Sequence, residues 1–235
     1  EIEGGNAPNM VPDYCQALIR TDYPEVFRQA VEDYLHNNPG LKIDTEDKDG
    51  GLLIKSHGIS AHGSLPQDGH NAISQLMVFL AELDIYSDEL KEIFRFYRDK
   101  IGMEYDGDSF GCRLEDEVSG TLTFNVGKIS LKDEEFIITI NIRYPVTCEL
   151  SELKLLLEKG IAGTGFLYEE TSHQPPLYVE KDNPLVQSLM KVYQKYTGDN
   201  SEPITIGGGT YARALDNAVA FGPLFPGQEE LAHQK

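Results

Sequence analysis

A histidine in a glycine-rich turn is the first residue whose surroundings point to chemistry. His62 lies within residues 58–66 (GISAHGSLP), between a strand-like segment and a helix-like segment. An imidazole in this place can polarise a carbonyl group or donate a hydrogen bond to an oxyanion. The alternative is a solvated turn histidine without a function, because turns collect polar residues for their own geometry.

An arginine near the end of an apolar segment is the second such residue. Arg143 is preceded by the alternating stretch that begins at Phe136. A guanidinium group there can bind a carboxylate through two parallel hydrogen bonds. An edge-strand arginine that lies in water or forms a structural ion pair would have the same pattern.

A glycine turn follows the apolar run 204–206 and has the sequence GGGTYAR over residues 207–213. The N–H groups of such a turn can hold a carboxylate. The spacing of Gly207, Gly209 and Ala212 formally matches a dinucleotide fingerprint. A dinucleotide site needs a crossover helix and a βαβ unit of about 30 residues, whereas the next strand-like segment starts within a few residues. We therefore favour carboxylate binding.

The segment EELAH at residues 229–233 places a carboxylate and the imidazole of His233 on one face of a helix, because the spacing is three or four residues. His233 could ligate a metal ion, although a single histidine near the end of a chain commonly has no function. The sequence contains neither an H-E-x-x-H nor a G-x-S-x-G motif.

The charge of the chain excludes two classes of partner. Its 235 residues include 20 Lys and Arg against 39 Asp and Glu, a formal net charge of −19. Nucleic-acid binders place cations on phosphates, and an acidic surface repels both nucleic acid and anionic lipid. The apolar runs are far shorter than the ~20 residues that span a bilayer, and no basic-then-apolar leader opens the sequence. We expect small-molecule or protein partners, no nucleic acid, no membrane and a cytoplasmic location.

The cysteines indicate reduced thiols. Cys15, Cys112 and Cys148 are an odd number at wide spacings, which matches neither a disulfide framework nor a zinc knuckle. Free cysteines are among the most buried residues. We expect these three to be mostly buried fillers of the core.

Apolar periodicity predicts the elements that must position these residues. Strands are expected at 10–19, 41–46, 52–60, 121–130 and 136–144, and helices at 25–35, 72–83, 86–100 and 149–159. Residues 102–120 are expected to form a loop. The order strand, strand, helix occurs in 41–83 and again in 121–159, which indicates a possible internal duplication.

The pattern breaks at the Pro-Pro segment of residues 172–176, since such a segment stays extended and continues neither a helix nor a strand. We expect a domain boundary near residue 175. Beyond it the sequence predicts a helix at 184–196 and strands at 203–206 and 218–221. That order indicates a fragment of an α/β sheet.

Taken together, these segments resemble the dinuclear-zinc exopeptidases of the aminoacylase and carboxypeptidase type, and most closely the bacterial peptidase V-type dipeptidases. The resemblance covers essentially the whole chain. The matching pieces are residues 4–13 (GGNAPNMVPD), 58–73 with the histidine signature (GISAHGSxPxxGxNAI), Arg143, 207–213 and 221–233.

The resemblance implies a fold and a domain organisation. Residues 1–175 would form an α+β lid of two ferredoxin-like strand-strand-helix lobes. Residues 176–235 would be the C-terminal part of an α/β zinc-exopeptidase catalytic domain. The N-terminal catalytic half, which carries the family's other metal ligands and its general base, is absent from this sequence.

The resemblance also implies roles for the matching residues. His62 would contact the scissile carbonyl and its oxyanion, and Asn9 would be a second polar group at that carbonyl. Arg143 would bind the terminal carboxylate of a dipeptide together with the turn Gly208-Gly209. His233 would be the last metal ligand.

The implied function is metal-dependent hydrolysis of the peptide bond in dipeptides, with two zinc ions in the full-length parent and manganese or cobalt also accepted. This chain should be inactive alone, because one ligand cannot hold two metal ions. Two similar lobes would mimic a dimer, so we expect a monomeric full-length protein. The alternative is a non-catalytic peptide-binding or dimerisation module, which would have no use for the glycine turn and His233.

Overall fold

Two units make up the chain in the computed structural model, which describes residues 1–48, 50–83, 87–222, 225 and 228. The first unit is Glu1–His173 and the second is Gln174–Lys235. The division lies close to the boundary predicted near residue 175. The assignment of the two units to a lid and to part of a catalytic domain stays a prediction.

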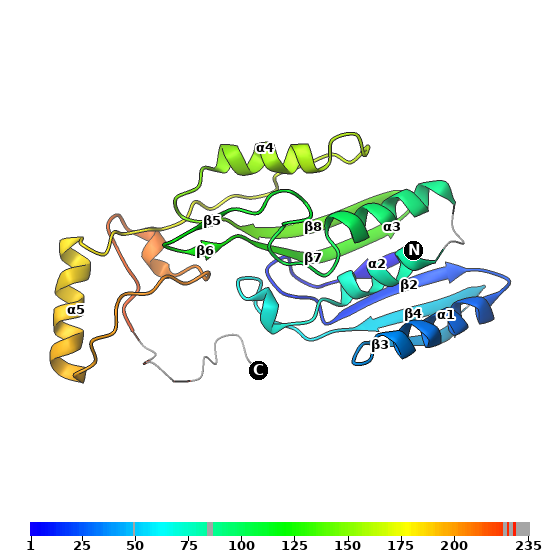
Figure 1. Ribbon diagram of the computed structural model, residues 1–235, viewed down its shortest axis with the longest axis horizontal. Helices are drawn as coiled ribbons and strands as arrows, with labels where there is room; N and C mark the ends of the chain where they lie inside the picture. The colour runs from blue at the N-terminus through cyan, green and yellow to red at the C-terminus, as the bar shows by residue number, and fades with distance from the viewer. Residues whose placement is uncertain (49, 84–86, 223–224, 226–227, 229–235) are drawn as a thin grey trace. The chain divides into compact units, whose positions relative to one another are not determined.

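A six-stranded sheet with the order β3-β4-β2-β1-β7-β8 organises the first unit, and all neighbouring strands in it are antiparallel (Figure 1). The predicted mixed α and β architecture is confirmed at this level. The strands are β1 Ile2–Gly4, β2 Tyr14–Arg20, β3 Lys42–Lys48, β4 Gly51–His57, β7 Thr123–Lys132 and β8 Glu135–Arg143. The segment 102–120, predicted to be a loop, also takes part in a small second sheet of β5 Glu115–Asp116 and β6 Gly120–Thr121.

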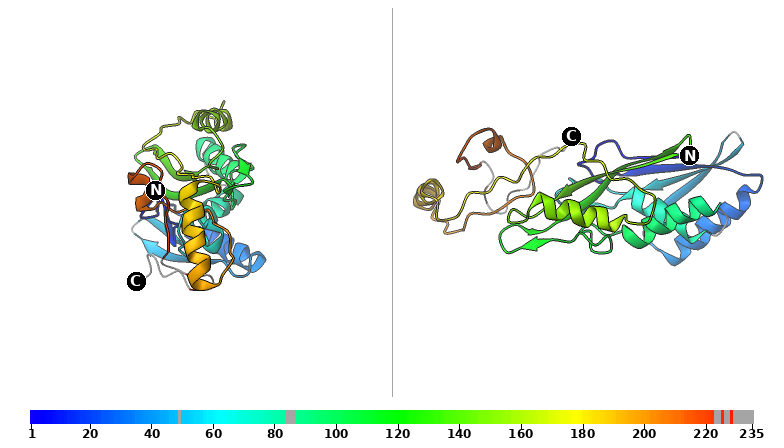
Figure 2. Two further views of the ribbon diagram at one scale, coloured as in Figure 1. Left: turned by 90° about the vertical axis from the view of Figure 1, so that its left-hand side faces the viewer. Right: turned by 90° about the horizontal axis from the view of Figure 1, so that it is seen from above.

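Four helices cover one face of the six-stranded sheet (Figure 2). They are α1 Pro24–Asn37, α2 Ala72–Glu82, α3 Asp88–Lys100 and α4 Leu150–Gly160. Helix α2 packs on β2, β4 and β7, while α3 packs on α2. The buried apolar residues of all four helices belong to one hydrophobic core, to which the sheet contributes residues such as Ile54 and Phe124.

The two predicted strand-strand-helix segments, β3-β4-α2 and β7-β8-α4, share this one sheet and core. Their hairpins differ in placement: β3, the first strand of its hairpin, is one edge of the sheet, whereas β8, the second strand of its hairpin, is the other edge. The two hairpins thus lie at opposite edges of one sheet, and the internal duplication stays a prediction. The description of each lobe as ferredoxin-like stays a prediction.

The second unit contains α5 Pro184–Thr197, which the side chain of Asn183 caps by accepting a hydrogen bond from the Leu185 N–H. The strands predicted at 203–206 and 218–221 are wrong, because neither segment is a strand. Ile204 is 84% exposed. A strand exists only through hydrogen bonds to a neighbouring strand, and the described residues of this unit supply none.

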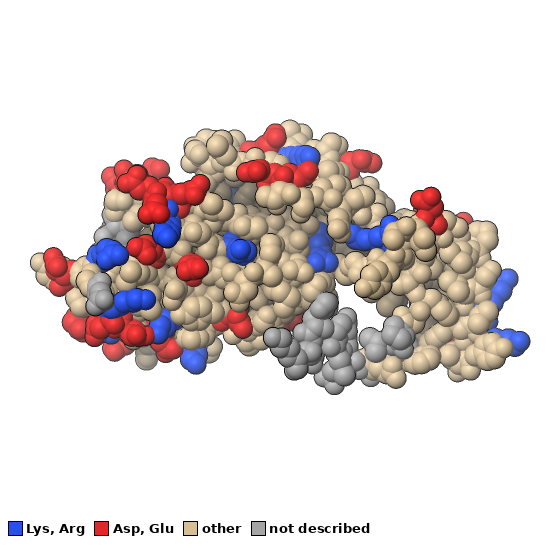
Figure 3. All heavy atoms as spheres, turned by 180° about the vertical axis from the view of Figure 1, so that it is seen from behind, with Lys and Arg blue, Asp and Glu red and all other residues tan. Residues whose placement is uncertain are grey.

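The surface agrees with the acidic composition. On the face in Figure 3, acidic side chains gather in groups, and basic side chains lie between them and beside uncharged surface. Among the helices that the structure describes, none is both long enough and apolar enough to cross a lipid bilayer.

Asp116 joins the small sheet to the turn after β8. Its carboxylate accepts hydrogen bonds from the N–H and hydroxyl of Ser119 and from the N–H and hydroxyl of Thr147. Partial desolvation raises the pKa of this carboxyl group, but the hydrogen bonds from Ser119 and Thr147 outweigh it and lower the pKa to about 2. The contribution of Asp116 to stability is therefore fully present above the unfolded pKa of about 3.9 and is lost as the pH falls toward 2.

We predict that Asp116→Asn lowers the melting temperature of the chain at pH 6 by about 2–4 °C, the change that about 1 kcal/mol causes in a domain of this size. Thermal unfolding followed by circular dichroism at pH 6 and at pH 2.5 measures the difference. The gap between wild type and variant should shrink at pH 2.5, because the wild-type carboxylate is then being protonated. A gap of equal size at both pH values would contradict the role of the charge.

Candidate functional site

Two loops pair with each other at one end of the six-stranded sheet. Residues 5–13 join β1 to β2, and residues 58–71 lead from β4 to α2. Because Tyr14 at the start of β2 is the partner of His57 at the end of β4, both loops leave the sheet at the same end. The antiparallel pairing then continues beyond the strands, since the Gly58 N–H donates to the Asp13 carbonyl at 2.8 Å.

This pairing makes Asn9 and His62 neighbours. Met10 and His62 form an isolated antiparallel bridge, flanked by hydrogen bonds from the Val11 N–H to the Ala61 carbonyl and from the Gly63 N–H to the Asn9 carbonyl, both at 2.8 Å. In this arrangement the bridged residues are a narrow, non-hydrogen-bonded pair with Cα atoms about 4.5 Å apart. The structure thus brings together two residues far apart in the sequence.

Glycine at position 63 permits this approach. A Cβ atom built on Gly63 would lie 2.9 Å from the carbonyl oxygen of Asn9, closer than real Cβ contacts. Any other residue would push the two loops apart. The close approach of the two loops therefore explains why a glycine follows His62 in the signature.

The histidine ring is held by the residue two positions further on. The N–H of Ser64 donates to Nδ1 of His62 at 3.3 Å, and the Ser64 hydroxyl lies 2.6 Å from the same nitrogen. An amide N–H can only donate, so Nδ1 acts as an acceptor and the proton of the neutral ring is on Nε2. This tautomer can donate from Nε2 to a carbonyl oxygen, and the side chain is half-buried.

Arg143 lies at the same end of the sheet as the two loops. It is the last residue of β8 and pairs with Thr123, the first residue of β7. Its Nε donates to Oδ1 of Asn141 at 3.2 Å. Ile140 and Ile142 pack on the core, so alternation along the strand places Asn141 and Arg143 on the face of the sheet opposite to the helices.

A buried asparagine on β7 connects the loops to this edge of the sheet. Nδ2 of Asn125 donates to the carbonyl groups of Pro8 and Met10, both at 2.9 Å. The cross-strand partner of Asn125 is Asn141, the residue that binds Arg143. Hydrogen bonds thus attach the loops of Asn9 and His62 to β7, and strand pairing places Asn125 opposite Asn141, which binds Arg143. The roles of Asn9, His62 and Arg143 stay predictions.

Asn125 is not among the predicted site residues. The signal in the sequence is an asparagine between the apolar residues Phe124 and Val126 of a predicted strand. A buried amide is costly unless it is hydrogen-bonded, so such a residue marks a specific partner. The partner itself, a loop more than a hundred positions away, is visible only in the fold.

Two predicted site features belong to other parts of the chain. Gly208 and Gly209 lie in an irregular, largely exposed segment of the second unit, so their joint role with Arg143 stays a prediction. His233 lies outside the described residues. Among the residues that the structure describes, no group of three or more His, Cys, Asp or Glu side chains could hold a metal ion.

The thiols are structural. Cys15 and Cys112 are buried and free, and Cys148 is half-buried and free. Burial raises the pKa of the Cys15 thiol, and it raises that of Cys112 to about 12. Thiols with raised pKa values are poor nucleophiles.

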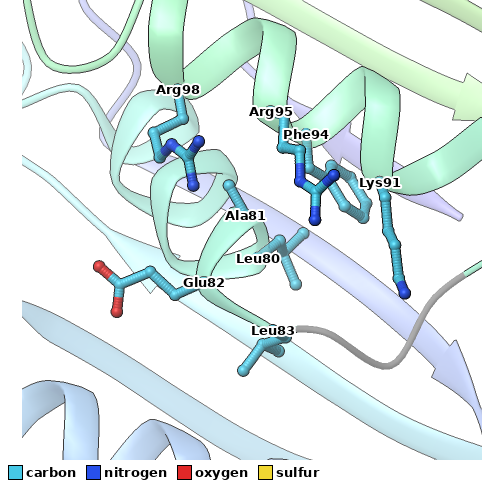
Figure 4. A pocket seen from close by; sticks show the side chains of 8 residues that line it. All are labelled: Leu80, Ala81, Glu82, Leu83, Lys91, Phe94, Arg95 and Arg98. Atoms are coloured by element: carbon cyan, nitrogen blue, oxygen red, sulfur yellow. The ribbon is translucent and has the colours of Figure 1, made fainter. Parts of the chain in front are cut away.

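A hollow of about 310 Å³ lies between the C-terminal end of α2 and α3 (Figure 4). Cationic side chains from α3 extend over it toward the end of α2. Its lining residues are Leu80, Ala81, Glu82, Leu83, Lys91, Phe94, Arg95 and Arg98. No predicted site residue lines the hollow. The paired loops adjoin the other, N-terminal end of α2, about 15 Å away along the helix at 1.5 Å per residue.

Comparison with known proteins gives two findings. Residues 50–153, from the turn before β4 to α4, match the family described as "Peptidase dimerisation domain". The chain is also similar over its length to bacterial proteins about twice as long. It is 37% identical over 235 residues to "Putative dipeptidase YtjP" of Bacillus subtilis strain 168, covering 100% of this chain and 50% of that protein.

Two staphylococcal proteins show the same relationship. A "Putative dipeptidase" of Staphylococcus haemolyticus is 37% identical over 237 residues, with 100% of this chain and 50% of that protein covered. One of Staphylococcus saprophyticus is 38% identical over 235 residues, with 98% and 49% covered. The chain therefore spans about half the length of the relatives that it matches.

We predict that Gly63→Ala destabilises the chain by about 1–3 kcal/mol, the range for an added methyl group that has no space. Urea unfolding measures the change. The matched control is Gly208→Ala, because a Cβ at Gly208 meets nothing within 4 Å, and its effect should stay within about 0.5 kcal/mol. Equal stabilities of Gly63→Ala and wild type would show that the two loops are not pressed together at this point.

Proposed function

We propose that the chain is the lid and the C-terminal catalytic part of a metal-dependent dipeptidase, because residues 50–153 match the family described as "Peptidase dimerisation domain" and the whole chain is similar to proteins named putative dipeptidases. The supporting observation is that Asn9, His62 and Arg143 all lie at one end of the six-stranded sheet, the first two on paired loops and the third at the end of β8. These are the groups that the cleavage of a short peptide requires from a lid.

The proposed role of His62 and Asn9 is to stabilise the carbonyl oxygen as it becomes negative. Nε2–H of His62 and the side-chain amide of Asn9 are both hydrogen-bond donors. Donors held rigidly where charge develops lower the barrier, because they bind the transition state better than the substrate. The Ser64 contacts keep the imidazole in the tautomer that can donate.

The proposed role of Arg143 is to bind the terminal carboxylate of the substrate, together with Gly208 and Gly209. Its guanidinium group carries five N–H donors in a planar arrangement, and Nε among them donates to Asn141. An arginine can bind a carboxylate through two hydrogen bonds. A fixed cation at a short distance from the reacting carbonyl selects dipeptides over longer peptides.

Metal dependence is a further part of the proposal. Two zinc ions are expected in the full-length protein, with manganese or cobalt as other metals that ligands of this kind accept. The described residues hold no cluster of ligands for an ion, and His233 is outside them. No step assigned above to Asn9, His62 or Arg143 passes through a metal ion.

The matched domain bears on the oligomeric state. A dimerisation domain suggests that members of its family form homodimers. That description also favours the second candidate function, a dimerisation or peptide-binding module without catalysis. The monomeric state of the full-length protein and its cytoplasmic location stay predictions.

The proposal predicts metal-dependent cleavage of dipeptides by the parent protein extended at the N-terminus. A panel of dipeptides, with and without added zinc or manganese, should be cleaved only by the extended protein with metal. The same dipeptides with an amidated C-terminus should be cleaved more slowly, because Arg143 then has no carboxylate to bind. Absence of metal-dependent cleavage in the extended protein would favour the module.

We predict that His62→Ala lowers the kcat of the extended protein by roughly 10²-fold or more, the scale of losing one oxyanion donor. Steady-state kinetics on one dipeptide measures it. His36→Ala is the control, because His36 is an exposed histidine at the end of α1. An unchanged kcat for His62→Ala would remove His62 from the mechanism.

A further inference from the structure

Asn125 is a buried polar residue of β7. It is 2% exposed, and so are its neighbours Phe124 and Val126. Phe124 and Val126 belong to the core under the helices. Alternation along the strand therefore sends Asn125 to the opposite face, where residues 8–10 cover it.

Asn125 binds the backbone on both sides of Asn9. Its Nδ2 donates to the carbonyl of Pro8, directly before Asn9, and to the carbonyl of Met10, directly after it. The carbonyl of Asn9 itself accepts from the N–H of Gly63, next to His62. Three consecutive carbonyl groups are thus fixed, two by Asn125 and one by the histidine loop.

The backbone of β7 is shaped to receive this loop. The pairing of β7 with β8 shifts register between Val126 and Lys128, which is a bulge at Gly127. A Cβ on Gly127 would lie 2.3 Å from the Pro8 carbonyl oxygen, so only glycine allows the loop to lie this close. Without the bulge and the glycine, the carbonyl groups of the loop would not reach Asn125.

A second asparagine fixes the histidine loop to the same point. Nδ2 of Asn71 donates to the carbonyl of Val126 at 2.8 Å. Oδ1 of Asn71 accepts from the N–H groups of Ile73 and Ser74 and so caps α2. The loop that carries His62 is therefore attached to β7 one residue from Asn125.

Asn125 also adjoins the proposed carboxylate-binding edge. Its cross-strand partner Asn141 lies on the same face of the sheet and accepts the hydrogen bond from Nε of Arg143. Directly opposed residues on one face of antiparallel strands have Cβ atoms about 4.5–5.5 Å apart. Asn125 thus lies between the loops of Asn9 and His62, the proposed oxyanion-binding groups, and the strand of Arg143.

We propose that Asn125 is a positioning residue that sets Asn9 and His62 at a fixed place relative to Arg143. The inference rests on the proposed dipeptidase function. Asn125 touches no substrate; it acts through the backbone of residues 8–10 and, through Gly63, on the histidine loop. Loss of its two donors leaves the carbonyl groups of Pro8 and Met10 unsatisfied and frees the loop.

The test compares Asn125→Ala with Ser74→Ala. Ser74 is a matched control, because it is also buried, 3% exposed, and its hydroxyl lies 2.9 Å from the Tyr97 hydroxyl within the helix-covered core. Both variants lose buried hydrogen bonds, but only Asn125→Ala loses the hydrogen bonds to the carbonyl groups of Pro8 and Met10. Should Asn125→Ala fail to fold, Asn125→Ser, which keeps one donor, takes its place.

Hydrogen exchange on the 235-residue chain gives the first readout. The N–H groups of Val11 and Gly63, which bridge the two loops, should exchange at least about 10-fold faster in Asn125→Ala than in Ser74→Ala, relative to amides of β4. Unchanged exchange at Val11 and Gly63 would overturn the proposal, whatever the catalytic function.

Kinetics of the extended protein give the second readout. Asn125→Ala should lower kcat for a dipeptide by roughly 10-fold or more and leave KM within about twofold, because groups that act only on the transition state affect kcat. Ser74→Ala should keep both values. Faster exchange without a loss of kcat would overturn the positioning role. An inactive wild-type protein would overturn the proposed function. In that case the exchange result alone would show whether Asn125 holds the two loops.

Discussion

Hydrogen bonds to the carbonyl groups of the loop between β1 and β2 hold together the end of the first unit at which the two loops pair. An unpaired buried carbonyl costs as much as a lost hydrogen bond. The carbonyl groups of residues 8–13 find donors on Asn125, on the histidine loop and on the first residue of α2. One loop therefore joins β7, the histidine loop and α2 into one rigid region.

The helix-covered core supports this region from behind. Helix α2 is buried from Ala72 to Met77, including its polar residues Ser74 and Gln75. Gln75 has partners for its amide, since Nε2 donates to the Lys42 carbonyl and to the Ser56 hydroxyl, both at 2.9 Å. Burial and these hydrogen bonds hold the helix that follows the histidine loop, and the proposed site would need such support to be preorganised.

Under the proposed function, one edge of the lid would serve two ends of a small substrate. The two loops would supply donors for a carbonyl oxygen, and β8 would supply a guanidinium group. The loop of residues 8–10 is bound by Asn125 on β7, and Arg143 is bound by Asn141, the residue of β8 that pairs with Asn125. A short substrate fixes the distance between its carbonyl and its carboxylate, so a rigid strand between the two binding groups is suited to it.

The sequence by itself determined the features that depend on neighbouring residues. Periodicity placed the helices and both hairpins, and residue type marked His62 and Arg143 as groups that could do chemistry. The tertiary structure alone decided the strand order, the three-residue strand β1, the absence of strands at 203–206 and 218–221, and the link through Asn125. The physical reason is that a strand, and a buried amide, are stable only with hydrogen-bond partners from distant parts of the chain, and local pattern does not specify those partners.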